Sequence, residues 1–155
     1  MKNGLENDLE GLQQVHLDVR QPLSILIVDD EVHMVDELVE AFSFEGYTVT
    51  GVTSPKKAQE ILSHDANIGV MISDIRMPEC DGITLSNLVL KNRDESNALE
   101  IVLVTGHGLR AEAEAELRNH SFAFVRKPFL LDEIFSVTEA ALGRAANRRK
   151  QALPN

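Results

Sequence analysis

The sequence predicts a doubly wound α/β domain built on a five-stranded parallel sheet, and three observations lead to that prediction. Short apolar runs of strand length alternate five times with stretches whose apolar residues recur at helical spacing. Several of these runs are apolar throughout, which is typical of strands buried on both faces of a parallel sheet. Each connection is long enough to hold a helix, as a right-handed crossover between parallel strands requires.

The expected strands are short, and most end on a polar residue or just before one. They cover residues 24–28, 47–52, 68–74, 100–105 and 122–125. The first and third are the clearest, because each is a continuous apolar run that stops at a carboxylate.

The expected helices carry their apolar residues on one face. They cover residues 32–42, 55–62, 83–89, 109–119 and 131–142. Gly46 closes the first helix as a C-terminal cap, and Ser54 with Pro55 opens the second as N-cap and first-turn proline. The fourth helix is the most loosely held, because alternating alanine and glutamate from Ala111 to Glu116 leaves it little apolar surface to bury.

Length and composition set the domain organisation. The 155 residues, 43% of them hydrophobic, are enough for one domain with a real core, here residues 23–143. Residues 1–22 form an N-terminal extension in which Leu5, Leu9, Leu12, His16 and Val19 fall at helical spacings, so it is either a short amphipathic helix or a frayed arm. No apolar run approaches a membrane span or a secretion signal, and we expect a cytoplasmic protein.

Charge and cysteine content exclude several function classes. The formal net charge of -10 argues against binding of nucleic acid or anionic lipid by the body of the chain. The lone cysteine, Cys80, allows no internal disulfide and gives no metal-ligand spacing, so we interpret it as a buried or idle thiol and not as a nucleophile.

A basic C-terminal tail, residues 144–155, stands apart from the acidic remainder. It holds four basic residues and no acidic one, whereas residues 1–143 hold 11 basic and 25 acidic residues. Nucleic-acid or membrane binding through this tail is one reading. We favour the other, in which the basic residues complement a helix C-terminus or rest on the acidic body, because twelve residues hold no DNA-binding fold.

Polar residues at four strand ends form the candidate site. Asp29 and Asp30 follow the first strand, Asp74 ends the third, Thr105 ends the fourth, and Lys127 follows the fifth. Because the carboxyl ends of parallel strands meet at one edge of the sheet, we expect all five side chains in one pocket. Each residue alone has a commoner explanation, such as a helix-capping acid or a solvated lysine; only their joint placement points to a site.

The expected chemistry is phosphoryl transfer with a divalent cation. Carboxylates held this close repel one another by about 4 kcal/mol per pair at an effective dielectric near 20, unless a cation lies among them. An all-oxygen donor set suits Mg²⁺, or Mn²⁺ in its place. Phosphoryl transfer needs little beyond positioning and charge neutralisation, and an aspartate can serve as its nucleophile. Asp74 is the candidate because it is central in the set.

The motifs resemble those of the receiver domain of two-component response regulators. They are Val28-Asp29-Asp30-Glu31, Asp74-Ile75-Arg76-Met77-Pro78 with Asp81-Gly82, Val104-Thr105-Gly106 and Lys127-Pro128-Phe129. The resemblance covers roughly residues 23–143 and implies a flavodoxin-like (βα)5 fold with strand order 2-1-3-4-5.

The resemblance also implies a role for each matching residue. Asp74 is the phosphoacceptor; Asp29, Asp30, Asp74 and the main-chain carbonyl of Arg76 bind Mg²⁺. Thr105 and Lys127 bind the phosphoryl group as the remaining catalytic residues, Thr105 and Phe124 form the switch, and the Lys127-Pro128 bond is cis. Cys80 stands where the family often has a bulkier apolar residue, and Arg76 and His107 occupy positions that tune the lifetime of the phosphoryl group.

We therefore expect a stand-alone receiver of a two-component phosphorelay. It would take a phosphoryl group from the phosphohistidine of a sensor histidine kinase or a histidine phosphotransfer protein. It would catalyse only its own phosphorylation and dephosphorylation, and would not be an enzyme acting on a separate substrate. Its output would pass to a protein target or a second copy through the helix 109–119, the strand 122–125 and the helix 131–142.

Two alternatives to the stand-alone receiver are kept. One is a Mg²⁺-dependent phosphohydrolase of the haloacid dehalogenase type, although Asp29-Asp30-Glu31 lacks that family's Asp-x-Asp pattern. The other is the receiver fragment of a longer regulator with a DNA-binding or enzymatic output domain.

Overall fold

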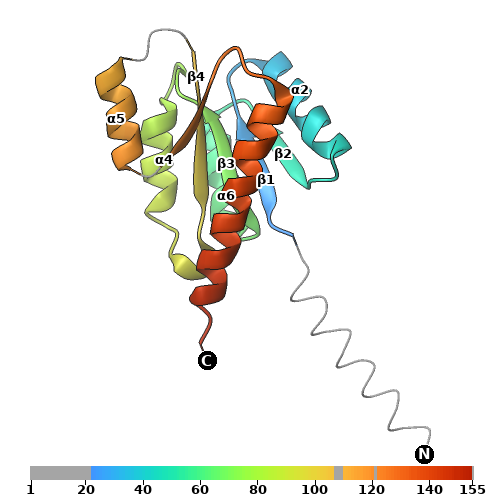
Figure 1. Ribbon diagram of the computed structural model, residues 1–155, viewed down its shortest axis with the longest axis vertical. Helices are drawn as coiled ribbons and strands as arrows, with labels where there is room; N and C mark the ends of the chain where they lie inside the picture. Colours follow the sequence, from blue (N-terminus) through green and yellow to red (C-terminus); the bar gives the residue numbers. More distant parts are fainter. Residues whose placement is uncertain (1–21, 107–109, 121, 155) are drawn as a thin grey trace, which may run out of the picture.

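A computed structural model describes residues 22–106, 110–120 and 122–154 of the chain. Five strands form one parallel sheet in the order β2-β1-β3-β4-β5 (Figure 1). They are β1 (Ser24–Val28), β2 (Val49–Val52), β3 (Ile68–Asp74), β4 (Glu100–Thr105) and β5 (Ala123–Arg126). The expected fold class and strand order are confirmed.

Helices cover both faces of this sheet (Figure 1). They are α2 (Val32–Phe44), α3 (Pro55–His64), α4 (Gly82–Leu90), α5 (Ala111–Asn119) and α6 (Leu131–Gln151), with a short 3-10 helix η1 (Glu95–Asn97) before β4. One core, which includes Leu85 and Leu117, packs α3, α4 and α5 against the sheet. A second, which includes Phe42 and Ile134, packs α2 and α6 against the other face. The sheet is thus buried on both sides, as the apolar strands predict.

The helix boundaries follow local sequence signals. The Ser54 hydroxyl accepts a hydrogen bond from the main-chain N–H of Lys57 at the start of α3, and Pro55 is the first helical residue. Gly46, with φ of 94°, lies just beyond the end of α2 in the left-handed conformation that glycine adopts without strain. The expected caps at these three residues are confirmed.

Helix α6 extends beyond residue 142, where the last helix was expected to end. It runs to Gln151, so that most of the expected tail continues the last helix. The buried positions Ile134, Thr138, Ala141 and Ala145 lie three or four residues apart and form one stripe against the sheet. Among the described residues, no helix is long and apolar enough to cross a membrane.

Arginines hold the end of α6 to the amino-terminal edge of the sheet. Arg148 pairs with Glu95 and Glu100, so the basic residues do rest on acidic ones. The Arg149 guanidinium donates to the main-chain carbonyls of Ala66, Ile68 and Ala98.

Arg93, between α4 and η1, makes similar contacts at the same edge of the sheet. Its guanidinium donates to the main-chain carbonyls of Leu62, Asp65, Ile68 and Asn97. Burial lowers the pKa of Arg93 and of Arg149, and the neighbouring Arg93 charge lowers the pKa of Arg149 further.

Two expectations lie partly outside the described residues. The first concerns the N-terminal extension, of which only residue 22 is described, and the second concerns the start of the fourth helix at residue 109. In the described part, α5 begins at Ala111 and its one buried side chain is Leu117. The weak apolar face expected for this helix is therefore confirmed.

Candidate functional site

Three aspartates meet at the carboxyl-terminal edge of the sheet. Asp29 and Asp30 follow β1, and Asp74 is the last residue of β3. Each offers a carboxylate oxygen, and these three oxygens all lie within 4.8 Å of one another. Asp29 is buried, Asp74 is partly buried and Asp30 is exposed, so the cluster opens to solvent on the Asp30 side.

Lys127 brings a positive charge to the same edge from the end of β5. Its Nζ atom lies 3.6 Å from Oδ2 of Asp29 and 3.8 Å from Oδ2 of Asp74. Its main-chain N–H donates to the carbonyl oxygen of Thr105 over 2.7 Å, which joins the ends of β4 and β5. The peptide bond between Lys127 and Pro128 is cis, as the resemblance implies. The expected convergence of these strand ends is therefore confirmed.

Burial raises the pKa of Asp29 and of Asp74 above the ordinary value for aspartate. For Asp29, the hydrogen bond donated by the Glu31 main-chain N–H and the Lys127 charge oppose the rise, whereas Asp74 and Asp30 add to it. For Asp74, Lys127 opposes the rise and the Asp30 charge adds to it. At neutral pH these carboxylates are thus destabilised in their charged form, which a cation would relieve.

Thr105 supplies a hydroxyl at the end of β4. Its side chain is only 1% exposed, and its Oγ1 atom has no hydrogen-bond partner among the described residues. Because a buried polar group without a partner is costly, this hydroxyl has the capacity to bind an oxygen atom of a group brought to the site.

Gly82 shapes the site, and reasoning from the sequence missed this contribution. Its main-chain N–H donates to the carbonyl of Ile75 over 2.8 Å, which folds the loop after β3 back on itself. A Cβ atom at this position would overlap the main-chain carbonyl oxygen of Asp74. The absent side chain therefore allows the start of α4 to lie against the end of β3. The sequence signal was the Asp81-Gly82 pair, which is typical of a turn but does not show that Gly82 lies against the Asp74 main chain.

The donor set fits a hard divalent cation. All three side-chain ligands are carboxylate oxygens, which Mg²⁺ and Mn²⁺ prefer. The pKa values of Asp29 and Asp74 are raised, so their charged forms are destabilised, and a bound cation would stabilise them. Arg76 and Asp30 both line a cavity of about 520 Å³, and the family resemblance implies the Arg76 main-chain carbonyl as a further ligand. The residues that would hold the ion are Asp29, Asp30, Asp74 and the carbonyl of Arg76.

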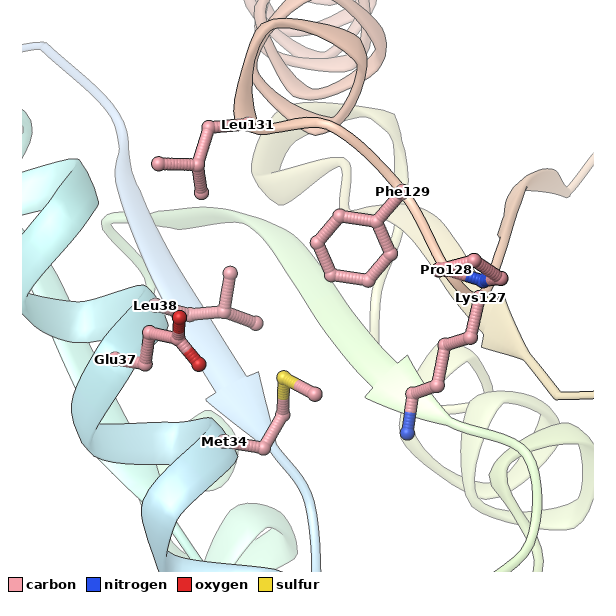
Figure 2. A pocket seen from close by; sticks show the side chains of 7 residues that line it. All are labelled: Met34, Glu37, Leu38, Lys127, Pro128, Phe129 and Leu131. Carbon is pink, nitrogen blue, oxygen red and sulfur yellow. The ribbon is translucent and has the colours of Figure 1, made fainter.

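A second cavity, of about 460 Å³, opens beside Lys127 between α2 and the segment that leads into α6. Figure 2 shows Met34 and Leu38 on α2 and Phe129 and Leu131 on the other side of it, with the Lys127 side chain extending toward the end of β3. It is lined by Met34, Glu37, Leu38, Lys127, Pro128, Phe129 and Leu131. Leu131, which lines it, is 44% exposed, and the adjacent residue Leu130 is 77% exposed. An apolar surface thus adjoins the charged site.

The remaining predicted residues lie around this centre. Phe124 on β5 is partly buried, and the guanidinium carbon of Arg118 lies 5.5 Å from the centre of its ring. The side chain of Arg76 is exposed, and Cys80 is partly buried against the core, where burial and the Asp81 charge raise the pKa of its thiol. His107 lies outside the described residues. The structure places Phe124, Arg76 and Cys80, and the roles of all four residues stay predictions.

Comparison with known proteins identifies the family. Residues 25–139 match the response regulator receiver domain family, and the chain belongs to it. The match assigns this domain to two-component signalling. The matched residues include Asp29, Asp30 and Asp74, the three aspartates at the edge of the sheet.

Individual relatives agree with this assignment. The chain is 34% identical over 119 residues to the phosphoglycerate transport system transcriptional regulatory protein PgtA of Salmonella typhimurium, covering 77% of this chain and 28% of that protein. It is 34% identical over 120 residues to the response regulator SaeR of Staphylococcus epidermidis, covering 77% of this chain and 50% of that protein. The chain thus spans half or less of the length of these relatives.

Solved structures share the fold. A response regulator receiver domain protein from Clostridium thermocellum superposes with a TM-score of 0.70 at 23% identity, covering 84% of this chain and 99% of that one. The equivalence extends over nearly the whole of the solved domain, so the fold is that of a complete receiver domain.

Proposed function

We propose that this chain accepts a phosphoryl group on Asp74 from a phosphohistidine donor and passes the signal on through a changed surface. The observation that carries the proposal is the meeting of Asp29, Asp30, Asp74 and Lys127, from three separate segments of the chain, at one edge of the sheet. Membership of the receiver family supports it. The chemistry would be confined to this chain's own phosphorylation and dephosphorylation.

In the proposed reaction a carboxylate oxygen of Asp74 attacks the phosphorus atom of the donor. A P–O bond forms as the P–N bond to the donor imidazole breaks, and the imidazole keeps the electron pair and takes up a proton. Asp74 is held for this attack at the end of a buried strand, so its position costs little ordering at the moment of reaction. Bound Mg²⁺ would neutralise charge on the phosphoryl oxygens.

Lys127 and Thr105 would hold the transferred group. The Lys127 ammonium lies between Asp29 and Asp74, where it can contact an oxygen of a group bonded to Asp74. The Thr105 hydroxyl, without a partner among the described residues, can donate to another. Two donors in contact with the same oxygen-rich group would stabilise the charge that phosphoryl transfer spreads over it.

Intact-mass analysis after treatment with a small phosphodonor and Mg²⁺ tests the proposal. The wild-type chain should gain one phosphoryl group, and Asp74→Asn should gain none. Asp36→Asn, which removes an exposed acid on α2, is the matched control and should be labelled like the wild type. Undiminished labelling of Asp74→Asn, or labelling that a chelator leaves unchanged, would overturn the assignment.

The apolar cavity beside Lys127 is the proposed docking surface for the phosphohistidine protein. Lys127 borders both this cavity and the acidic cluster, so a partner seated there would bring its phosphoryl group to Asp74. Leu130→Ser removes exposed apolar surface at the N-cap of α6, where serine is a better cap. It should slow transfer from a phosphohistidine protein and leave labelling by a small phosphodonor unchanged. Phe44→Ser, at the far end of α2, is the control.

The length of the relatives favours a second candidate, in which this receiver is one part of a longer regulator. The chain covers 28% of PgtA and 50% of SaeR, and both of these proteins are named as regulators. In that case the same phosphorylation would act on an attached output domain. The mass of the protein detected in its native cells by an antibody against this domain decides between the two.

A further inference from the structure

A buried serine, Ser73, directly precedes Asp74 in β3. Its side chain is fully buried, and the strand residues before it, 68–72, are apolar apart from one glycine. Val28 of β1 and Leu103 of β4 lie opposite it on the two sides in the sheet. Because a buried hydroxyl needs a hydrogen-bond partner, the partner of Ser73 indicates what this side chain contributes.

The Ser73 hydroxyl donates to the main-chain carbonyl of Asp74 over 2.9 Å. The pairing of β3 with β1 ends at Ser73, and its pairing with β4 ends at Asp74. The Asp74 carbonyl thus lies where the regular pairing of the sheet stops, and main-chain groups at such a point need partners from elsewhere. A side chain supplies one here.

Two further contacts restrict the same peptide unit, which joins Asp74 to Ile75. The Asp74 carbonyl oxygen lies against Gly82, where a Cβ atom would overlap it. On the other side of the unit, the Ile75 N–H donates to the main-chain carbonyl of Val104 over 3.1 Å. The unit is therefore held by a hydrogen bond at each end and by a close contact at its carbonyl oxygen.

The orientation of this peptide unit affects the Asp74 carboxylate. Burial raises the pKa of Asp74, whereas the main-chain N–H groups of Ile75 and Arg76 oppose the rise, so both N–H groups act on the carboxylate. A turn of the unit would move the Ile75 N–H relative to the carboxylate. It would also displace the start of the loop that carries the main-chain carbonyl of Arg76.

We propose that Ser73 is a positioning residue for phosphoryl transfer, because its hydroxyl holds the peptide unit after Asp74 and thereby the Asp74 carboxylate in the reactive orientation. The inference rests on the proposed function and adds to it a residue that touches neither the phosphoryl donor nor the metal. Without the hydroxyl, the unit gains freedom to turn, and the carboxylate spends less time aligned for attack.

Ser86 on α4 provides a matched control. It is also fully buried, and its hydroxyl also donates to a main-chain carbonyl, that of Gly82, over 2.6 Å. That hydrogen bond lies within one turn of α4 and does not involve the peptide unit after Asp74. Ser73→Ala and Ser86→Ala should both lower the urea midpoint, so a general loss of stability would affect both variants alike.

Two measurements on the full chain test the inference. The first is the rate of labelling by acetyl phosphate at saturating Mg²⁺, followed by intact mass. Ser73→Ala should be labelled about three- to tenfold more slowly than the wild type, the range expected for the loss of one hydrogen bond, and Ser86→Ala at the wild-type rate. The second is Mn²⁺ binding without a phosphodonor, followed by electron paramagnetic resonance. Ser73→Ala should bind Mn²⁺ about twofold or more weakly, because Asp74 is one of the expected ligands.

Ser73→Thr separates positioning from packing. Threonine keeps the hydroxyl and suits a strand, so this variant should recover most of the labelling rate. If circular dichroism shows Ser73→Ala to be unfolded, Ser73→Cys, with a weaker donor of similar size, replaces it in both measurements.

The outcomes distinguish this inference from the proposed function. Wild-type labelling or wild-type Mn²⁺ affinity in folded Ser73→Ala, an equal loss in Ser86→Ala, or no recovery in folded Ser73→Thr would overturn the role of Ser73. The proposed function would then stand, because the wild type would still be labelled. A wild type that acetyl phosphate does not label would overturn both.

Discussion

Replacing Asp29 by asparagine should stabilise the metal-free protein at neutral pH. Asparagine keeps the side-chain oxygen that accepts the hydrogen bond from the Glu31 main-chain N–H, at 2.9 Å, and replaces the oxygen that faces Lys127 by an uncharged amide nitrogen. The carboxylate is 5% exposed. The substitution therefore isolates the cost of holding a buried negative charge beside two others.

The magnitude follows from the distances at the site. The Asp74 and Asp29 oxygens lie within 4.8 Å of each other, so their repulsion is at least about 3.5 kcal/mol at an effective dielectric near 20. The exposed Asp30, within the same distance, adds at least about 0.9 kcal/mol at the dielectric of water. Lys127, at 3.6 Å, returns about 4.6 kcal/mol. The attraction and the repulsions nearly cancel. The desolvation cost of burying the Asp29 carboxylate therefore decides whether the substitution raises or lowers the free energy of unfolding. We expect a gain of about 1–2 kcal/mol, or roughly 3–8 °C in Tm.

The gain should depend on pH in a defined direction. Because burial raises the pKa of Asp29, the folded protein binds its proton more tightly than the unfolded chain. Stability of the wild type therefore falls as pH rises from the unfolded pKa through the raised folded pKa. Asp29→Asn has no carboxyl group at this position, so its stability does not fall for this reason. The difference in stability between variant and wild type should be near zero at about pH 3, and full only above the folded pKa.

Thermal unfolding in chelator, followed by circular dichroism from acid to neutral pH, measures this difference. Asp36→Asn, the exposed control on α2, should change Tm little at any pH. Mg²⁺ should raise the Tm of the wild type more than that of Asp29→Asn. A lower Tm for Asp29→Asn in chelator at neutral pH, or a gain of equal size at both ends of the pH range, would refute the reasoning.

Further substitutions test the packing around the site and the end of α6. Gly82→Ala should cost about 1–3 kcal/mol and slow labelling, because its Cβ overlaps the Asp74 carbonyl. Gly143→Ala on α6, where a Cβ has open space, should raise the free energy of unfolding by about 0.5–1 kcal/mol. If urea unfolding gave the same change in stability for Gly82→Ala and Gly143→Ala, the overlap at Gly82 would be contradicted. Arg149→Ala should cost about 1–3 kcal/mol, with Arg149→Lys recovering only part, because lysine lacks the guanidinium fork. An unchanged urea midpoint for Arg149→Ala would show that its contacts do not stabilise α6.

The sheet and the meeting of its polar strand ends were predictable because both follow from simple periodicities. Apolar runs with helical connections specify a parallel sheet, and a parallel sheet brings Asp29, Asp74 and Lys127 to one edge wherever they lie in the sequence. The site could thus be located without knowledge of side-chain packing. The role of each residue rests on the family resemblance, which covers the same positions.

Features that depend on tertiary neighbours were missed. The last helix was expected to end near residue 142, before a basic tail, although Ala145 continues the buried stripe of α6 and marked the longer helix. Arg93 and Arg149 bond to main-chain carbonyls, which leave no pattern in a sequence. The short helix η1 was not among the expected helices, and its signal was Asp94, whose carboxylate accepts a hydrogen bond from the main-chain N–H of Asn97.

The most direct test of the account locates the phosphoryl group on the chain. After labelling with a small phosphodonor and Mg²⁺, borohydride reduces an aspartyl phosphate to homoserine, and peptide mass spectrometry reads the altered position. The account predicts homoserine at position 74 in the wild type, and none in Asp74→Asn or in a sample labelled with chelator present. Homoserine at position 29 or 30, or a label on serine or threonine that resists borohydride, would contradict it.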